Sequence, residues 1–169
     1  MHHKLYGLQK MGFDRERLAE RSDGAASLDS RLLRKVDAAF EGAAAEAVQA
    51  LRAMPPDAGI EARFEAALLA VLRAAAAAPD LTRLCLVEAP GLGANAVRSK
   101  ETGLQRFVEL LDRELAAGRR RAAPPLVSEM VVGGIYEVVQ RSARAGDVAR
   151  LPSLADQLSQ LWLPALRSQ

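Results

Sequence analysis

Apolar residues recur three and four positions apart along most of this chain, which is the spacing of one face of an α-helix. The pattern covers five stretches of the chain: residues 30–54, 59–78, 95–118, 125–145 and the segment after Pro152. A shorter apolar segment at 80–89 lies between the second and third of these. Together the segments predict an all-α fold, a helical bundle of about six helices.

The most apolar part of the chain is the segment from Leu81 to Ala89. It begins after Pro79, where Asp80 is a candidate N-cap for a short helix, and it ends at a Pro90-Gly91 turn. A segment that is apolar on every side must be enclosed by other elements. We therefore expect it at the centre of the bundle.

Prolines, glycines and capping residues mark the expected ends of the helices. Asp29 or Ser30 is the expected N-cap of the first helix, and the pair Pro55-Pro56 ends it because a proline cannot continue the hydrogen-bond ladder. Gly146 is expected to end the helix that starts at 125. The last helix follows Pro152.

Two adjacent glycines, Gly133 and Gly134, lie in the middle of the helix predicted over 125–145. Each costs up to ~1 kcal/mol relative to alanine. Because the apolar spacing continues through both, we expect a helix that another helix approaches closely there. Pro164 is expected to truncate or kink the last helix.

Residues 1–29 differ from the rest of the chain. Apolar residues are sparse there, glycines interrupt the pattern, and only residues 14–21 have helical character. We expect a loose N-terminal arm with at most one short helix, followed by one helical domain over 30–169. The only histidines, His2 and His3, lie in this arm.

Composition supports the helical prediction and excludes several functions. Half of the 169 residues are apolar, alanine dominates them, and aromatic residues make up only 4%. The net charge of +2 is too small to indicate a nucleic-acid surface, and the arginines of the loop 118–125 are expected to lie in a solvated turn at a helix end. The sequence has no apolar stretch typical of a membrane span or an export signal, so the expected location is the cytoplasm, with no membrane contact.

Few residues offer reactive chemistry. Cys85 is the only cysteine, and its apolar surroundings predict a buried structural thiol. No spacing typical of a metal site occurs, and a histidine-based catalytic triad would need the N-terminal arm to fold back. We therefore expect no enzyme activity, no metal and no cofactor.

The segment Gly91 to Ala96 matches the pattern GxGxxA, which in a dinucleotide-binding fold lets the backbone approach a pyrophosphate. That interpretation requires a strand–helix–strand unit. The chain downstream has helical spacing and no second strand pattern. We interpret the segment as a glycine-rich link between two helices.

Several residues have both a structural and a ligand-binding interpretation. Glu88, the one carboxylate in the apolar segment, is either a satisfied polar group at a helix end or a group that orients a ligand. Tyr136 either anchors the core, with its hydroxyl at the edge, or offers that hydroxyl to a ligand. Phe64, Phe107 and Met130 belong either to the core or to the wall of a pocket.

Three segments, in this order, resemble the C-terminal regulatory domain of TetR-family transcriptional regulators. They are PDLTRLCLVEAPGLG before a long helix with LQRFVELL, then PPLVSEMVVGGIYEVVQRSARAGD, and finally LPSLADQLSQLWLPAL. The segment VDAAFEGAAAEAVQAL is also similar to the helix that joins the family's DNA-binding head to this domain. The resemblance extends from Arg31 to Gln169.

The resemblance implies a helical domain that holds a small apolar or amphipathic effector among its middle helices and forms a homodimer through its last two helices. The implied ligand-binding residues are Phe64, Leu68, Cys85, Glu88, Phe107, Met130 and Tyr136. The implied dimer interface consists of Val131, Gly134, Ile135, Val138, Leu154, Leu158, Leu161 and Trp162. The residues alone also favour self-association, because two apolar helices at the end of the chain leave much apolar surface to cover.

The chain departs from the family at its N-terminus. Members begin with a three-helix DNA-binding head of about fifty residues, whereas DRERLAERSDGAASLDS is only faintly similar to the second half of that head. The chain is then either a truncated or frame-shifted regulator or a derived domain that does not bind DNA alone and forms mixed dimers with an intact relative. The alternative function is a structural or interaction protein with a filled core and no ligand, which acts by dimerising with related regulators.

Overall fold

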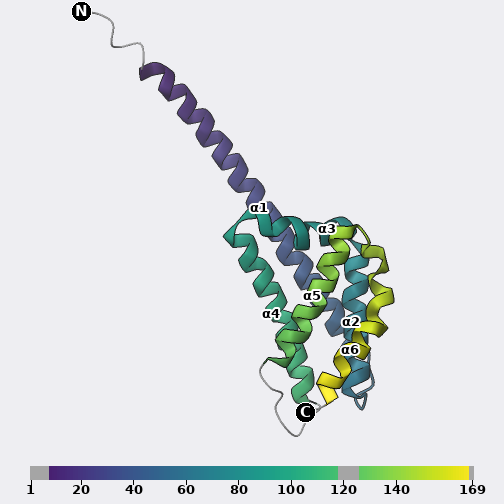
Figure 1. The fold of residues 1–169 in the computed structure, drawn as a ribbon. Coiled ribbons are helices and arrows are strands. Elements are labelled where there is room, and N and C mark those ends of the chain that lie inside the picture. The colour runs from purple at the N-terminus through teal and green to yellow at the C-terminus, as the bar shows by residue number, and fades with distance from the viewer. Residues whose placement is uncertain (1–7, 118–125, 168–169) are drawn as a thin grey trace, which may run out of the picture.

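A 45-residue helix, α1 (Leu8–Arg52), is the longest element of the chain. Its second half packs among the other helices, and its first half projects beyond them (Figure 1). The computed structural model describes residues 8–117 and 126–167. The histidines of the N-terminal segment, the arginine loop and Pro125 lie outside these ranges.

Five further α-helices complete the bundle. They are α2 (Ile60–Ala77), α3 (Pro79–Arg83), α4 (Ala94–Ala117), α5 (Val127–Ala145) and α6 (Ala155–Arg167). Shorter helical segments join them: η1 (Leu84–Glu88), η2 (Ala89–Leu92) and η3 (Val148–Leu154). The structure is 90% helical, with six helices and no strand in the described ranges, which confirms the all-α bundle.

The start of α1 differs from the prediction. The helix begins at Leu8 rather than at Ser30 and passes through Gly12 and Gly24 without a break. An isolated glycine costs only about 1 kcal/mol, which good helix formers on either side offset. Residues 8–52 therefore form one continuous helix and contain no helix-turn-helix.

The apolar segment after Pro79 is built from three kinds of helical turn. Pro79 is the first residue of α3, and Ala78, not the predicted Asp80, occupies the N-cap position. A proline suits the first helical position because its fixed φ angle is already helical. The chain then widens into the π-helical η1 and tightens into the 3₁₀-helical η2. Cys85 is 3% exposed, so this segment lies inside the bundle as expected.

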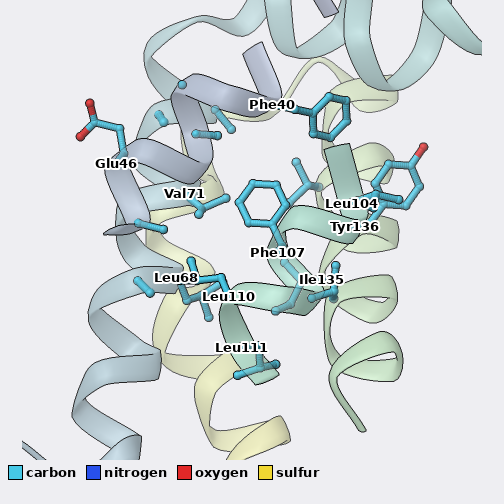
Figure 2. A pocket seen from close by; sticks show the side chains of 18 of the residues that line it. Phe40, Glu46, Leu68, Val71, Leu104, Phe107, Leu110, Leu111, Ile135 and Tyr136 are labelled. Atoms are coloured by element: carbon cyan, nitrogen blue, oxygen red, sulfur yellow. The ribbon is translucent and has the colours of Figure 1, made fainter. Parts of the chain in front are cut away.

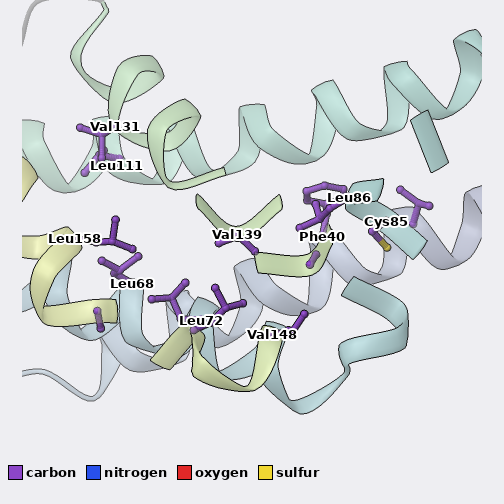
Figure 3. Close-up of a cluster of buried hydrophobic side chains, with 14 of the residues drawn as sticks. Phe40, Leu68, Leu72, Cys85, Leu86, Leu111, Val131, Val139, Val148 and Leu158 are labelled. Atoms are coloured by element: carbon purple, nitrogen blue, oxygen red, sulfur yellow. The ribbon is translucent and has the colours of Figure 1, made fainter. Parts of the chain in front are cut away.

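Buried side chains of α2 and of the C-terminal elements η3 and α6 belong to one hydrophobic core. Leu72 on α2 and Leu151 on η3 are completely buried, and Figure 3 shows Leu72 beside Val148 and Leu68 toward Leu158. Helix α2 is therefore covered by η3 and α6 on this side.

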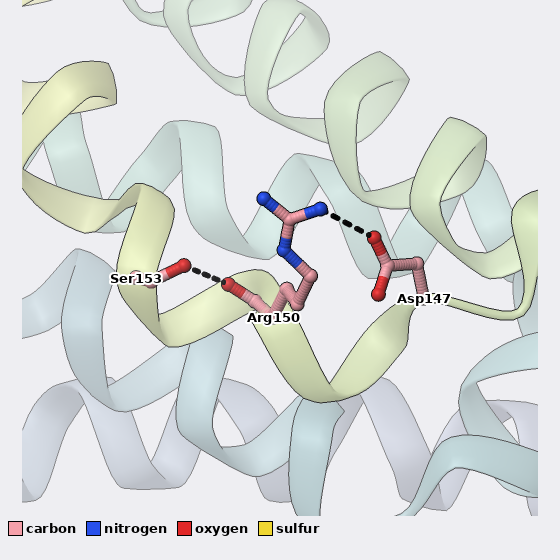
Figure 4. A network of polar contacts seen from close by, with 3 residues as sticks. All are labelled: Asp147, Arg150 and Ser153. Atoms are coloured by element: carbon pink, nitrogen blue, oxygen red, sulfur yellow. Dashed lines mark hydrogen bonds and ion pairs between the residues drawn. The ribbon is translucent and has the colours of Figure 1, made fainter.

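The link between α5 and α6 is fixed by local hydrogen bonds. Gly146 ends α5 as predicted, in a left-handed conformation with φ 74°. The Arg150 guanidinium pairs with the Asp147 carboxylate at 3.2 Å, and the Ser153 hydroxyl donates to the backbone oxygen of Arg150 at 2.7 Å (Figure 4). Helix α6 continues through Pro164 to Arg167, so of the two predicted effects, truncation or a kink, truncation does not occur.

In residues 8–117 and 126–167, no helix combines the length and the apolar character that crossing a bilayer requires.

Candidate functional site: an apolar cavity along α2

A cavity of about 410 Å³ lies among α1, α2, α4 and α5, and the segment α3–η1 lines part of it (Figure 2). This volume falls within the range of about 300–1,000 Å³ that is usual for small-molecule sites. Most of the lining residues are alanine, leucine, valine, isoleucine and phenylalanine. The cavity therefore has the size and the chemistry of a site for an apolar ligand.

One face of α2 forms a wall of the cavity from end to end. Its lining residues recur three and four positions apart: Ile60, Arg63, Phe64, Ala67, Leu68, Val71, Ala74, Ala75 and Ala78. From Ile60 to Ala78 this face is about 27 Å long at 1.5 Å per residue. Alanine side chains predominate toward its C-terminal end and leave space that larger residues would fill.

Helices α1, α4 and α5 form the other walls. Small residues of α1, among them Ala39, Ala43 and Ala47, face the same cavity. Phe107 of α4 projects into the middle of the view in Figure 2, between Val71 and Ile135. Two facing helices that are both rich in alanine thus border a volume that neither fills.

A close contact between α1 and α4 supports the upper part of this enclosure. The ring of Phe40 lies against Gly103, where the space is too small for even a single Cβ atom. Glycine at this position allows the two helices to approach closely while Phe40, which is 7% exposed, remains in the wall of the cavity.

An ion pair contributes the main polar feature of the wall. Arg63 Nε and Glu114 Oε2 are 2.6 Å apart and join α2 to α4, with side chains 24% and 18% exposed. This hydrogen bond raises the pKa of the Arg63 guanidinium above its usual value, so Arg63 is charged. The pair as a whole is neutral.

Thr82 and Cys85 are two further lining residues with polar atoms. The Thr82 hydroxyl donates to the backbone oxygen of Ala75 at 2.8 Å. Burial raises the pKa of the Cys85 thiol to about 11, so the thiol is protonated at neutral pH and is a poor nucleophile. This agrees with its interpretation as a structural residue.

Tyr136 presents its ring to the cavity and its hydroxyl to the protein. The Gln140 amide donates to the Tyr136 hydroxyl at 2.9 Å and to the backbone oxygen of Leu86 at 2.8 Å. Lys100 Nζ lies 5.6 Å from the ring centroid, a cation–π distance. Burial is the main cause that raises the pKa of Tyr136. These contacts favour the interpretation of Tyr136 as an anchor.

The structure brings five of the seven predicted ligand-binding residues together around the cavity: Phe64, Leu68, Cys85, Phe107 and Tyr136. Glu88 and Met130 do not line it. Glu88 is the last residue of η1 and pairs with Arg83 at 3.2 Å on the surface. Met130 is 63% exposed because it lies on the face of α5 opposite the stripe that lines the cavity, which is centred near Ile135 and Val139.

Most of the predicted dimer residues are buried or half-buried within the single chain rather than exposed on its surface. Val131 is 1% exposed and Leu158 is 6% exposed, so both belong to the core of the single chain. Ile135 lines the cavity, and Gly134 lies against the ring of Trp162, which leaves no space for a Cβ atom there. The predicted close approach thus occurs within one chain, at Gly134 and not at Gly133.

Two of the remaining predicted dimer residues, Val138 and Leu154, are half-buried against the core. Leu161, at 65% exposure, is the one strongly exposed large side chain of the predicted set. Two further exposed residues, Leu126 and Met130, lie one helical turn apart where α5 begins.

The motif at Gly91 to Ala96 joins helical elements, as expected. It leads from η2 into α4, and Gly93 between them has a positive φ of 102°. No strand precedes it in the described chain, so it lacks the setting of a dinucleotide-binding turn. Within the same ranges, no group of three or more His, Cys, Asp or Glu side chains is placed to hold a metal ion.

The sequence prediction missed the ion pair and the wall formed by α1. A signal existed for Arg63, which lies three residues after Ile60 on an otherwise apolar helical face. Glu114 likewise precedes Leu115 at the end of an apolar face of α4. Charged residues at the edge of two apolar faces are candidates for a pair, but sequence alone does not say that the two faces meet.

Comparison of the chain with protein-family models, with curated proteins and with solved structures gave no match. The cavity and the exposed apolar residues are therefore the features from which a function is inferred.

Proposed function

We propose that this chain is an effector-binding and dimerising regulatory domain of the kind that its TetR-family resemblance implies. The effector is a small apolar or amphipathic molecule that occupies the cavity along α2. The observation that supports this most is the cavity of about 410 Å³, which has apolar walls and includes five of the residues that the resemblance pointed to.

The position of α1 suggests how binding acts on the rest of the molecule. Its second half forms a wall of the cavity through Phe40 and Ala47, and its first half projects from the bundle (Figure 1). A ligand shifts the balance between two arrangements by its difference in affinity for them. An effector that prefers one position of the α1 wall would change the direction of the projecting half of α1. In a dimer it would also change the relative orientation of the two copies.

The proposed dimer uses the last two helices but a different set of residues from the one first predicted. Leu126, Met130 and Leu161 are each more than 60% exposed, and they replace Val131 and Leu158 in the proposed interface. Large exposed apolar side chains on neighbouring helices are typical of a surface that another chain covers. Mixed dimers with a related, DNA-binding chain remain part of this proposal.

The alternative, an interaction protein with a filled core, is less well supported. A filled bundle has few voids larger than a water molecule, whereas this bundle has the cavity described above. No enzymatic role is proposed, since the Cys85 thiol is protonated at neutral pH and the Tyr136 hydroxyl is engaged by Gln140.

Ligand-induced stabilisation tests the effector site. A panel of apolar small molecules is screened by the melting temperature of the wild type, of Ala67→Phe, which fills the cavity, and of Ala62→Phe, which adds the same ring on the exposed side of α2. A ligand at 100 times its Kd stabilises the fold by about 2.7 kcal/mol. We expect such shifts in the wild type and in Ala62→Phe only. No shift with any compound, or equal shifts in Ala67→Phe, would contradict the site.

Light scattering tests the dimer. We expect a dimer for the wild type and a monomer with an unchanged helical spectrum for the variant Met130→Glu with Leu161→Glu, because both side chains are exposed in the single chain. A wild-type monomer would refute the proposed interface. Ile135 and Trp162 are unsuitable for this test, since changes there would also disturb the cavity or the α5–α6 contact.

A further inference from the structure

The shape of the cavity restricts the ligand. Its lining runs along α2 from Ile60 to Ala78, about 27 Å at the helical rise of 1.5 Å per residue. Because the lining residues follow α2 from one end to the other, the cavity is elongated along this helix, and we call it the channel. A flexible, extended chain fits such a channel, whereas a compact polycyclic molecule would fill only part of its length.

The middle of the channel offers a ligand neither a charge nor a strong hydrogen bond. Thr82 donates to Ala75, and Tyr136 accepts from Gln140. Glu46 is exposed and its carboxylate points away from the cavity (Figure 2), so the rest of the wall is hydrocarbon. A polar ligand group placed here would lose its hydration without a partner, which costs several kcal/mol. The buried part of the ligand is therefore hydrocarbon.

The Arg63–Glu114 ion pair makes the channel polar near the N-terminal end of α2, unlike its middle. Only Arg63 Nε and Glu114 Oε2 are joined. Among the described residues, the two terminal nitrogens of Arg63 and Oε1 of Glu114 have no further hydrogen bond or ion pair. The pair therefore still offers donors on one side and an acceptor on the other, with no net charge.

This arrangement selects against charged head groups. A ligand carboxylate would compete with Glu114 for Arg63. A ligand ammonium would meet the positive guanidinium of Arg63. A hydroxyl or a primary amide both donates and accepts hydrogen bonds, so it can contact both partners without separating them.

Building on the proposed effector site, we propose that its ligand is a long aliphatic chain with an uncharged head group, a hydroxyl or an amide, that binds beside the Arg63–Glu114 pair. The chain lies along the alanine-rich face of α2. Ligands of this class are fatty alcohols and fatty amides.

Calorimetric titration of the full chain with three decyl compounds tests the head group. 1-Decanol, decanoate and decylammonium share the same chain and differ only in charge. We expect 1-decanol to bind at least tenfold more tightly than either ion. Removing one charge of the pair should reverse the preference: Glu114→Gln should favour decanoate, and Arg63→Gln should favour decylammonium, each by tenfold or more relative to the wild type.

A series of 1-octanol, 1-nonanol and 1-decanol tests the chain. Each added methylene that enters the channel should tighten binding about fourfold. Ala67→Phe should abolish the binding of all three, while Ala62→Phe, on the exposed side of the same helix, should leave it unchanged.

The outcomes separate this inference from the site on which it rests. Tighter binding of either ion by the wild type would overturn the head-group assignment. Binding of a compact hydrocarbon such as pyrene, sensitive to Ala67→Phe, in the absence of any alkyl binding would overturn the aliphatic chain and leave the effector site intact. If neither class binds, both the inference and the proposed effector site fail.

Discussion

The two sides of α2 carry apolar residues at the same helical spacing, yet one side is packed and the other is hollow. On the packed side, Leu72 is completely buried and Leu151 of η3 is equally inaccessible. On the hollow side, Ala67, Ala74 and Ala75 face a cavity of about 410 Å³. At these positions, residue size rather than polarity distinguishes the two sides.

The difference shows how this sequence keeps a site open inside a stable bundle. Large side chains on the packed side remove apolar surface from water at about 25 cal/mol per Å². On the other side, alanines of α2 face alanines of α1, so the helices still form but leave atoms without close neighbours. Phe64 and Leu68 on the hollow side also belong to the buried core, so both sides contribute to stability, but only the hollow side provides the binding volume.

Truncation of a leucine on the packed side should have the largest effect. Leu72→Ala is expected to lower the free energy of unfolding by about 2–5 kcal/mol, since it creates a new void among close-packed residues. Val71→Ala, one residue away on the wall of the cavity, should cost less than half as much. Urea denaturation of the two variants measures the difference, and equal losses would remove the contrast between the sides.

Enlarging an alanine should also distinguish a packed position from a position on the cavity wall. Ala143→Leu on α5 adds volume at a completely buried position outside the cavity and should destabilise the fold by about 1–3 kcal/mol. Ala74→Leu adds the same atoms into the cavity and should be neutral or stabilising. Thermal unfolding of both variants provides the comparison. A loss for Ala74→Leu as large as that for Ala143→Leu would indicate that the space is already filled.

The smallest expected effect is a pH dependence that arises from Cys85 on the hollow side. Burial raises the pKa of its thiol from 9.0 to about 11 in the folded chain, so the unfolded chain ionises first as the pH rises. The contribution to stability is complete below pH 9 and is lost between pH 9 and 11, with a loss of about 1 kcal/mol by pH 10. The difference in urea stability between wild type and Cys85→Ala, followed from pH 8 to 10.5, isolates this thiol from other groups. A constant difference would show that the thiol is not desolvated.

The helices were largely predictable because their signals are local. The apolar spacing and the breaks at Pro55-Pro56 and Gly146 place α2, α4 and α5 within a few residues of their observed ends. The start of α1 at Leu8 was not predictable in the same way. Scattered glycines reduce helix propensity without setting a stopping point.

The contacts between helices were less predictable. Spacing shows that Val131 and Ile135 share a face of α5, but it does not show whether that face meets its own core or a second copy. The structure directs both residues inward and leaves Met130 exposed. The cavity itself depends on the alanines of α1 facing those of α2, which is a tertiary contact that neither helix specifies alone.

A crystal structure determined under xenon pressure would test most directly whether the hollow side of α2 is an accessible apolar cavity. Xenon enters empty apolar cavities without regard to the identity of the natural ligand. We expect xenon density beside Val71 and Phe107, among α1, α2, α4 and α5, and none between α2 and η3. The absence of xenon from this cavity, or its presence only around Leu72, would contradict the account.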